Sequence, residues 1–140
     1  MTSGLHPPGG GAASYLATGA TTDGRFGLYR WDMGAEQGGA KPHFHRTMSE
    51  SSFVLSGTLQ IFDGTSWLDS RPVDFAHVPD GGGHGFRNES GEPASMLILF
   101  TPGAPREAYF EGLVDLAEGR WVPAHEELQA FLVEHDNHHL

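Results

Sequence analysis

The sequence contains no cysteine among its 140 residues. This absence excludes disulfide bonds, thiolate metal ligands and a cysteine nucleophile. A chain without cysteine is compatible with a reducing compartment, and we expect a cytoplasmic protein. Long apolar runs are also missing, since none approaches the roughly 18 residues of a membrane span. Residues 1–11 hold neither the charged nor the apolar segment of a signal peptide, so we expect no secretion signal.

Basic residues are scarce relative to acidic ones. Eight Lys and Arg stand against 18 Asp and Glu, which gives a formal net charge of −10 with histidine neutral. A surface of this charge repels phosphate backbones and anionic lipid headgroups. We therefore expect neither nucleic acid nor a membrane as a partner. Histidine, in contrast, is frequent, with nine residues that cluster in the sequence.

Glycine and proline are abundant, at 20 and 9 residues, and this density of turn formers is typical of an all-β fold rather than a helical bundle. Short apolar runs between the turns predict strands over residues 26–33, 53–62, 73–78 and 94–101. The second run should break into two strands near Gly57, and Asp63 with Gly64 predicts a hairpin turn. Strands at this spacing favour a sandwich or barrel over residues 15–104.

The two ends of the sequence differ from its centre. In the tail, residues recur three and four positions apart, as on one face of a helix. They are Phe110, Leu113, Val114 and Ala117, and then Leu128, Phe131, Leu132 and His135. We expect two short helices within residues 105–140, packed on the outer face of the barrel. At the other end, residues 1–14 are rich in Gly, Pro and Ser and are expected to form a mobile N-terminal arm.

Four residues in the middle of the chain suggest a metal site. His43 and His45 lie two positions apart, so on a strand they face the same side. Glu50 lies an odd number of positions further on, so a bulge, a turn or a second strand must bring its carboxylate to that side. His84 follows a run of three glycines, which we interpret as the turn that delivers it. Imidazole and carboxylate together suit a divalent first-row metal, but a solvated strand face would also explain the paired histidines.

Two stretches resemble the two sequence motifs of the cupin family. The stretch that runs from Gly38 through His43, His45 and Glu50 to Gly57 is similar to the first motif, with one residue fewer between the leading glycine and the first histidine. The second stretch runs from Pro79 through His84 to Asn88, and Val73 stands where the leading glycine of that motif is expected. Both motifs occur in the expected order, and every ligand position is filled.

The cupin resemblance implies an all-β fold, a cupin-type antiparallel β-barrel (jelly roll) with two short C-terminal helices. It also implies one divalent transition metal per chain, which could be Fe, Mn, Co, Ni, Cu or Zn. His43, His45 and His84 would supply imidazole nitrogens and Glu50 a carboxylate oxygen. Such a ligand set leaves one or two coordination positions open for water, dioxygen or substrate.

A narrower resemblance is to small bacterial cupins of the quercetin 2,3-dioxygenase-like group. It is carried by residues 29–33, 41–43, 53–57, 74–79, 86–94 and 99–103, by the two C-terminal helices and by the closing His135, Asp136 and Asn137. It implies a metal-dependent dioxygenase, an oxidoreductase that acts on a small aromatic or enol-containing compound, with Glu50 as the catalytic residue that receives a proton. The alternatives are a redox-neutral metal-dependent isomerase or polyketide cyclase, and a small-molecule-binding cupin without catalysis.

Three further residues are expected near a substrate pocket. Phe86 shares the strand parity of His84, and Val54 shares that of Glu50 if the strand between them is unbroken. His77 could point into the barrel toward the ligands, or outward as an ordinary strand residue. An apolar pocket with the metal as its main polar anchor would suit a small-molecule substrate. The family resemblance also implies a homodimer, with a sheet edge that needs covering and an N-terminal arm that could cross to the partner.

Overall fold

The computed structural model describes residues 4–5, 12–35, 41–117 and 119–139. Eleven strands and two helices lie within these residues. The strands are β1 (Gly4–Leu5), β2 (Ala12–Ala17), β3 (Gly27–Met33), β4 (His43–Phe44), β5 (Ser49–Ser56), β6 (Leu59–Phe62), β7 (Trp67–Ser70), β8 (Phe75–Val78), β9 (Gly85–Arg87), β10 (Ala94–Thr101) and β11 (His138–His139). The helices are α1 (Glu107–Ala117) and α2 (His125–Glu134).

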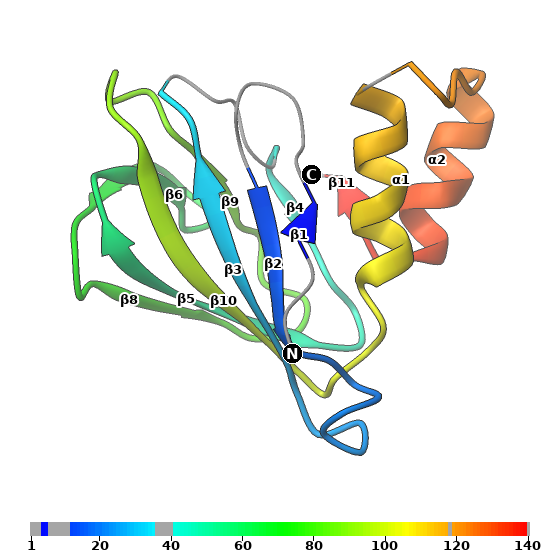
Figure 1. The fold of residues 1–140 in the computed structure, drawn as a ribbon, viewed down its shortest axis with the longest axis horizontal. Helices are drawn as coiled ribbons and strands as arrows, with labels where there is room; N and C mark the ends of the chain where they lie inside the picture. The colour runs from blue at the N-terminus through cyan, green and yellow to red at the C-terminus, as the bar shows by residue number, and fades with distance from the viewer. Residues whose placement is uncertain (1–3, 6–11, 36–40, 118, 140) are drawn as a thin grey trace.

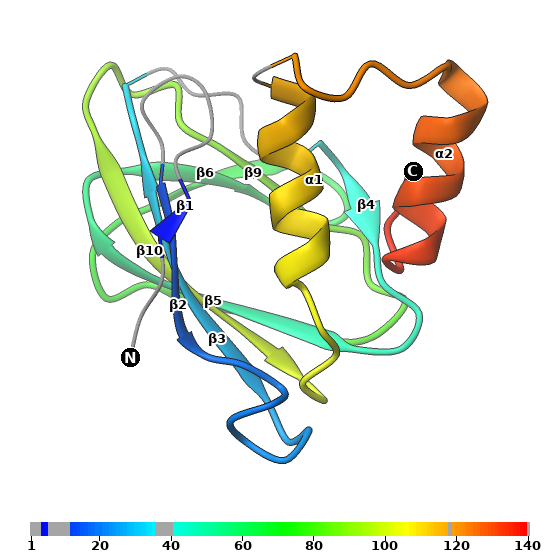
Figure 2. The ribbon, with the colours of Figure 1, turned by 45° about the vertical axis from the view of Figure 1, so that its right-hand side comes forward.

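The strand pairs among the described residues are all antiparallel. One sheet has six strands in the order β1-β2-β3-β10-β5-β8, a second has the order β7-β6-β9, and β11 pairs with β4. Figure 1 shows α1 and α2 together on one side of the strands, and Figure 2 shows β6 and β9 across from β5 and β10. The expected antiparallel β-barrel with two C-terminal helices is confirmed.

Two turns separate the central strands, and both follow from the sequence. Gly57 follows β5 with a φ of 75°, a left-handed conformation that glycine adopts without strain. A Cβ atom there would lie 2.5 Å from the carbonyl oxygen of Pro93, so no larger residue fits. Asp63 shapes the next turn, because its Oδ1 accepts hydrogen bonds from the amides of Thr65 and Ser66, both at 2.9 Å. The break near Gly57 and the hairpin between β6 and β7 are thus confirmed.

The strand registers decide which side chains face the barrel interior. Residues that lie opposite each other in paired strands point to the same face of the sheet. Glu50 lies opposite Phe100 and Val54 opposite Met96, which in turn lies opposite Trp31. The face of the sheet that carries Glu50 therefore also carries the apolar core. The buried core consists of Ala13, Tyr15, Tyr29, Trp31, Met33, Met48, Val54, Leu59, Ala94, Met96, Ile98, Phe100 and Phe110.

Helix α1 contributes to this interior. The centroid of the Phe110 ring lies 5.0 Å from that of Tyr29 and 5.8 Å from that of Trp31, and both partners point inward from β3. Figure 2 shows α1 standing between the six-stranded sheet and β4. The expectation that the helices pack on the outer face is therefore wrong for α1. Phe110 belongs to the buried core, and Tyr109 and Leu113 of the same helix pack against that core.

The expected N-terminal arm, residues 1–14, lies only partly within the described residues. Residues 1–3 and 6–11 lie outside them. In the described part, Leu5 lies opposite Ala13, and β2 begins at Ala12, where it lies opposite Asp32 of β3. The barrel therefore begins before the expected boundary, because the small residues at the end of the arm already pair with β3.

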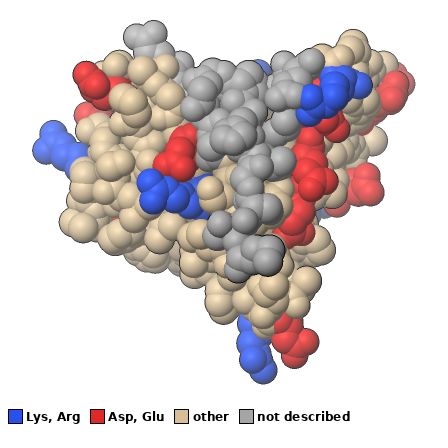
Figure 3. Space-filling view, in the orientation of Figure 1, with Lys and Arg blue, Asp and Glu red and all other residues tan. Residues whose placement is uncertain are grey.

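The surface in the view of Figure 3 carries acidic side chains over α1. This helix contains Glu107, Glu111 and Asp115, which follow one another at intervals of four residues and so share one helix face. The acidic character expected from the composition is thus visible on the helix that covers the barrel. Among the residues that the structure describes, no helix is long and apolar enough to cross a membrane.

We expect Phe110→Ala to lower the free energy of unfolding by about 3–5 kcal/mol, because it empties a site that is only 7% exposed. Urea unfolding followed by circular dichroism measures the change. Val122→Ala is the control, since Val122 is 85% exposed and its truncation should change the free energy by less than about 0.5 kcal/mol. An equally small loss at Phe110 would contradict the placement of α1 over the interior.

The homodimer stays a prediction. Strands β1 and β8 are the edges of the six-stranded sheet, and Phe75 on β8 has 65% of its surface exposed. Unpaired strand edges favour association with another chain. Sedimentation of the full chain should give twice the 15.1 kDa chain mass, and removal of residues 1–11, which precede β2, should weaken the association. A monomeric full-length protein would contradict this expectation.

Candidate metal centre

Four polar side chains come together inside the barrel from three segments of the chain. His43 belongs to β4, His45 lies just beyond its end, and Glu50 belongs to β5. His84 precedes β9 and is joined to His43 by two backbone hydrogen bonds of 2.8 Å each. The chain turns between His45 and Glu50, so a second strand resolves their odd spacing. The carboxylate thus returns to the histidine side, as the sequence predicts.

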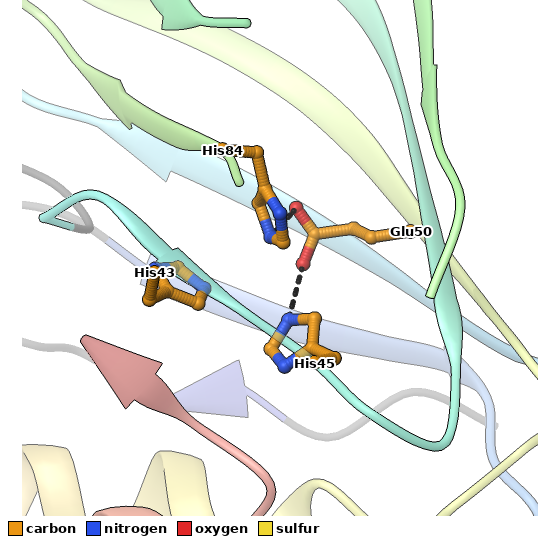
Figure 4. A group of neighbouring side chains, drawn as sticks. All are labelled: His43, His45, Glu50 and His84. Carbon is orange, nitrogen blue, oxygen red and sulfur yellow. Dashed lines mark hydrogen bonds and ion pairs between the residues drawn. The ribbon is translucent and has the colours of Figure 1, made fainter. Parts of the chain in front are cut away.

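The four side chains converge on one point, as Figure 4 shows. One ligand atom from each residue lies within 4.8 Å of the others, and all four residues are buried. The Glu50 carboxylate oxygens lie 3.3 Å from Nε2 of His45 and 3.2 Å from Nε2 of His84. His43 completes the group, because the centroid of its ring lies 4.4 Å from that of His84. The structure therefore assembles the ligand set that the motifs predict.

Each of the three histidines has its other ring nitrogen held by a backbone carbonyl. The atom concerned is Nδ1 in every case, and the pairs are His43 with Lys41 at 2.6 Å, His45 with Asp136 at 2.7 Å and His84 with Gly82 at 3.1 Å. A carbonyl only accepts, so each Nδ1 carries a hydrogen, and in the neutral ring each Nε2 presents a lone pair to the common centre. Hydrogen bonds of this kind orient the histidine ligands of metal sites.

Burial and mutual interaction shift the pKa values within the cluster. Burial, and then the charge of His84, lower the pKa of His43 to about 4, so this ring is neutral at pH 7. Burial alone would raise the pKa of Glu50, but the charge of His84 and the contact with His45 outweigh it and hold that pKa well below its usual range. Burial would likewise lower the pKa of His84, but the Glu50 carboxylate raises it. Glu50 is therefore an anion, and a cation entering the cluster competes with a proton.

The donor set fits a single divalent metal ion. Nε2 lone pairs and carboxylate oxygens are all acceptors. The Glu50 oxygens lie 3.3 Å from Nε2 of His45 and 3.2 Å from Nε2 of His84, so these atoms repel one another unless a proton or a cation lies between them. Nε2 of His84 is buried, and the Glu50 carboxylate, at 3.2 Å, is a polar neighbour with which it could share a proton or an ion. Three imidazoles with one carboxylate are a ligand set for Fe, Mn, Co, Ni, Cu or Zn. The residues present thus fit one such ion per chain.

The glycine run before His84 forms a tight loop that places this histidine next to His43 and His45. The amide of Gly81 donates to the carbonyl oxygen of His45 at 2.6 Å, which ties the loop to the histidine segment. A Cβ atom on Gly82 would lie 2.7 Å from Cγ1 of Val78, so the loop passes β8 too closely for a larger residue. The interpretation of this run as the turn that delivers His84 is confirmed.

Two of the three residues expected near a pocket lie in the barrel interior. Val54 is fully buried on the same face as Glu50, and Phe86 packs against the apolar core. His77 lies on the other face, because it pairs with Ser51, the residue after Glu50, and its Nδ1 lies 2.8 Å from the Ser51 hydroxyl. The suggestion that His77 serves the ligands from inside the barrel is wrong, since the two-residue period of β8 turns its side chain outward.

A cavity of about 250 Å³ opens between β6, β8 and the loop before His84. It is lined by Ile61, Phe62, Asp63, Ala76, His77, Val78, Pro79, Gly82 and Gly83. None of the four ligands is among these residues, so this cavity is not the expected pocket around the metal centre. The apolar substrate pocket stays a prediction.

Comparison with known proteins identifies the family. The family profile described as Cupin domain matches residues 29–100, just over half of the chain. The chain belongs to the cupin family. The matched range runs from β3 to β10 and includes all four candidate ligands, so the motifs, the fold and the site agree. No curated protein sequence matches this cupin.

Solved structures share the cupin fold at low sequence identity. A sugar phosphate isomerase of the cupin superfamily from Silicibacter pomeroyi is 27% identical, with a TM-score of 0.56, over 64% of this chain and 59% of that one. The polyketide cyclase RemF from Streptomyces resistomycificus is 21% identical, with a TM-score of 0.60, over 71% and 73% of the two chains. A predicted oxalate decarboxylase from Thermotoga maritima is 15% identical, with a TM-score of 0.59, over 73% and 92%. This cupin spans less than two thirds of the isomerase that it matches.

Two residues without a spacing signature lie around the ligand cluster. Asp136 supplies the carbonyl that orients His45 from 91 positions along the chain. Arg106 is 3% exposed, and its guanidinium lies 5.3 Å from the centre of the Phe100 ring, which in turn lies 6.0 Å from the ring of His45. The periodicity of a strand or helix predicts only which residues of that element share a face. It therefore could not predict the contacts of Asp136 and Arg106, which lie in connecting segments.

We expect about one metal ion per chain when this cupin is purified without chelator or nickel affinity resin, as measured by elemental analysis. His45→Ala and His84→Ala should each lose most of the metal, because each removes one of the four converging ligands. His77→Ala is the matched control and should keep full metal content, since this strand histidine faces outward. Full metal content in a double variant at His45 and His84 would place the site elsewhere.

Proposed function

We propose that this cupin is a metal-dependent enzyme that acts on a small aromatic or enol-bearing compound, with Glu50 as the proton acceptor. The observation that carries the proposal is the buried cluster of an ionised carboxylate and three imidazoles, whose ligand atoms lie within 4.8 Å of one another. A purely structural metal site is closed by protein ligands, whereas an ion with five or six coordination positions keeps some of them open in this set.

The roles of this chain's residues follow from their chemistry. A divalent metal bound by these ligands supplies Lewis acidity toward a substrate oxygen. Glu50 is placed to take up the proton that an enol or hydroxyl group releases, because its carboxylate is ionised and buried beside the centre. The Nδ1 hydrogen bonds keep the imidazole rings from rotating. The apolar core next to Glu50, which includes Val54 and Phe100, excludes bulk water from this step.

The proposed reaction is a dioxygenation. It is supported by the resemblance of the two motifs and of the C-terminal residues to the quercetin 2,3-dioxygenase-like group, and membership of that group stays a prediction. The ligand set is compatible with redox-active ions such as Fe, Mn, Co, Ni and Cu. Flavonols and 1,3-diketones combine an aromatic or enol group with a removable proton, so they are the first compounds to test.

The second candidate is a redox-neutral isomerase or polyketide cyclase. It is supported by the 27% identical cupin from Silicibacter pomeroyi, which is a sugar phosphate isomerase. The fold is also shared with the polyketide cyclase RemF, at 21% identity. Proton transfer through Glu50 is sufficient for such a reaction, and no oxidant is consumed. A third possibility from another class is a cupin that binds a small molecule without converting it.

Oxygen uptake distinguishes these candidates. Metal-loaded protein is incubated with flavonols and 1,3-diketones in an oxygen electrode, and the same mixtures are followed without oxygen. Oxygen consumption that matches substrate loss supports the dioxygenase. Conversion that continues without oxygen supports the isomerase or cyclase, and saturable binding without conversion contradicts both catalytic proposals.

For Glu50→Gln we expect metal affinity to fall modestly and turnover to fall by about 100-fold or more. The amide keeps an oxygen that can bind a metal ion, but it is neutral and a poor base. Metal titration and steady-state kinetics on the same preparation measure the two effects. Glu92→Gln, at an exposed position, is the control and should change neither. Losses of equal size in affinity and turnover would show that Glu50 is a ligand only.

A further inference from the structure

One of the three histidine ligands depends on a distant part of the chain. His43 and His84 each donate from Nδ1 to a carbonyl two residues earlier, Lys41 and Gly82, so a short local turn orients each ring. His45 instead donates to Asp136, 91 positions away and close to the end of the chain. The orientation of this ring is therefore not a local property of the histidine segment.

Asp136 occupies a backbone position that usually belongs to glycine. It lies just after α2, where the amide of Asn137 donates to the carbonyl of Leu132 at 2.8 Å and the amide of Asp136 donates to that of Val133 at 3.0 Å. This pair of bonds is the Schellman ending of a helix, and the residue at this point takes a left-handed conformation. Asp136 has a φ of 58°. Aspartate adopts this conformation less readily than glycine, and its short polar side chain can hydrogen-bond to nearby backbone.

The Asp136 carboxylate makes hydrogen bonds with the residues that follow His45. Oδ1 accepts a hydrogen bond from the amide of Arg46 at 2.8 Å. Oδ2 accepts from the amide of Thr47 at 2.8 Å and from its hydroxyl at 2.7 Å. A single residue therefore holds the ring of His45 through its carbonyl and the backbone beyond His45 through its side chain.

The segment that carries Asp136 is itself clamped from both sides. On one side, the buried Arg106 donates to the carbonyl of His135 and lies 3.5 Å from Oδ1 of Asn137, which is 4% exposed. Asn137 also donates to the hydroxyl of Tyr109 on α1. On the other side, β11 pairs with β4, so the chain after Asp136 lies against the strand that carries His43. These contacts hold the C-terminal segment against the barrel, and the Asp136 carboxylate is the group that joins this segment to the residues after His45.

We propose that Asp136 is a positioning residue of the metal centre. Its carboxylate fixes the Arg46–Thr47 turn against the C-terminal segment, and its carbonyl holds the Nδ1 hydrogen of His45. In a neutral imidazole the proton can reside on either nitrogen, and this hydrogen bond selects the tautomer whose Nε2 lone pair faces the ligand cluster. The inference rests on the metal centre of the proposed function, and it makes the C-terminal segment a determinant of metal affinity.

Metal titration of three variants tests the effect on affinity, with Co²⁺ as the probe. Asp136→Gly keeps the carbonyl and suits the left-handed backbone but removes the carboxylate, and it should raise the Co²⁺ dissociation constant by about 10-fold or more. Asp136→Asn keeps one acceptor oxygen and should give an intermediate value. Asp23→Gly is the matched control, because Asp23 has the same φ of 58° on an exposed turn, and it should leave the constant unchanged.

A spectroscopic measurement separates positioning from general support of the fold. Long-range ¹H–¹⁵N correlation spectra of the metal-free protein report which ring nitrogens of each histidine carry a hydrogen, including a proton shared between Nε2 and Glu50. We expect Nδ1–H in all three ligands of the wild type. In Asp136→Gly, His45 alone should become a mixture of tautomers, while His43 and His84 keep their local carbonyl partners and their signals.

Several outcomes would overturn the proposal. An unchanged affinity and an unchanged His45 signal in Asp136→Gly would show that the carboxylate positions nothing. An equal loss of affinity in Asp23→Gly would make the effect a general one of substituting a turn residue. A change in all three rings would assign the C-terminal segment a structural role only. If the wild type binds no Co²⁺, the metal centre fails as a proposal, and the spectra of the metal-free protein still decide the role of Asp136.

Discussion

An ionised carboxylate can lie inside an apolar barrel only where neighbouring groups compensate its charge, and the architecture around Glu50 follows from that constraint. Glu50 is 6% exposed. The imidazole of His45 lies next to one of its carboxylate oxygens, and that of His84 lies next to the other. Each imidazole then needs a partner for its second nitrogen, which is a carbonyl in every case. The glycine loop before His84 supplies the carbonyl of Gly82 to the His84 ring, and the segment after α2 supplies the carbonyl of Asp136 to the His45 ring.

The sequence predicts local features well and long-range ones poorly. The strand ending at Gly57 and the turn at Asp63 could be read directly, because a left-handed glycine and an aspartate that accepts from nearby amides act within a few residues. The ligand set could be predicted because two stretches resemble the cupin motifs with every ligand position filled, whereas strand parity alone relates only His43 to His45. The contact of His45 with Asp136 and the packing of Phe110 on the inner face of the sheet could not be predicted, because they depend on how α1 and α2 return to the barrel. The sequence alone allowed the His77 side chain to point either into the barrel or outward. The pairing of His77 with Ser51 of β5 shows that it points outward.

The fold and the ligand cluster are compatible with several reactions. Structures that share this fold include an isomerase and a polyketide cyclase, and a barrel of this kind serves many reactions through differences in its lining. Proton transfer to a buried carboxylate beside a Lewis acid is common to the oxygenase and the redox-neutral proposals. The choice between them depends on what the interior admits next to Glu50, where Val54 and Phe100 are already packed into the core.

The backbone pairing of His43 with His84 also links the cluster to the folding of the barrel. Side chains alternate along a strand, so a slip of β4 by one residue would turn His43 and His45 outward and carry Phe44 into the interior. In the native register, Phe44 stacks on His138 at a centroid distance of 5.1 Å, outside the ligand cluster. The ligand set is therefore assembled in only one register of this short strand. A bound ion would therefore stabilise molecules with the correct register of β4 over molecules in which this strand has slipped. It would contribute to the folding of the barrel in addition to any role in the reaction.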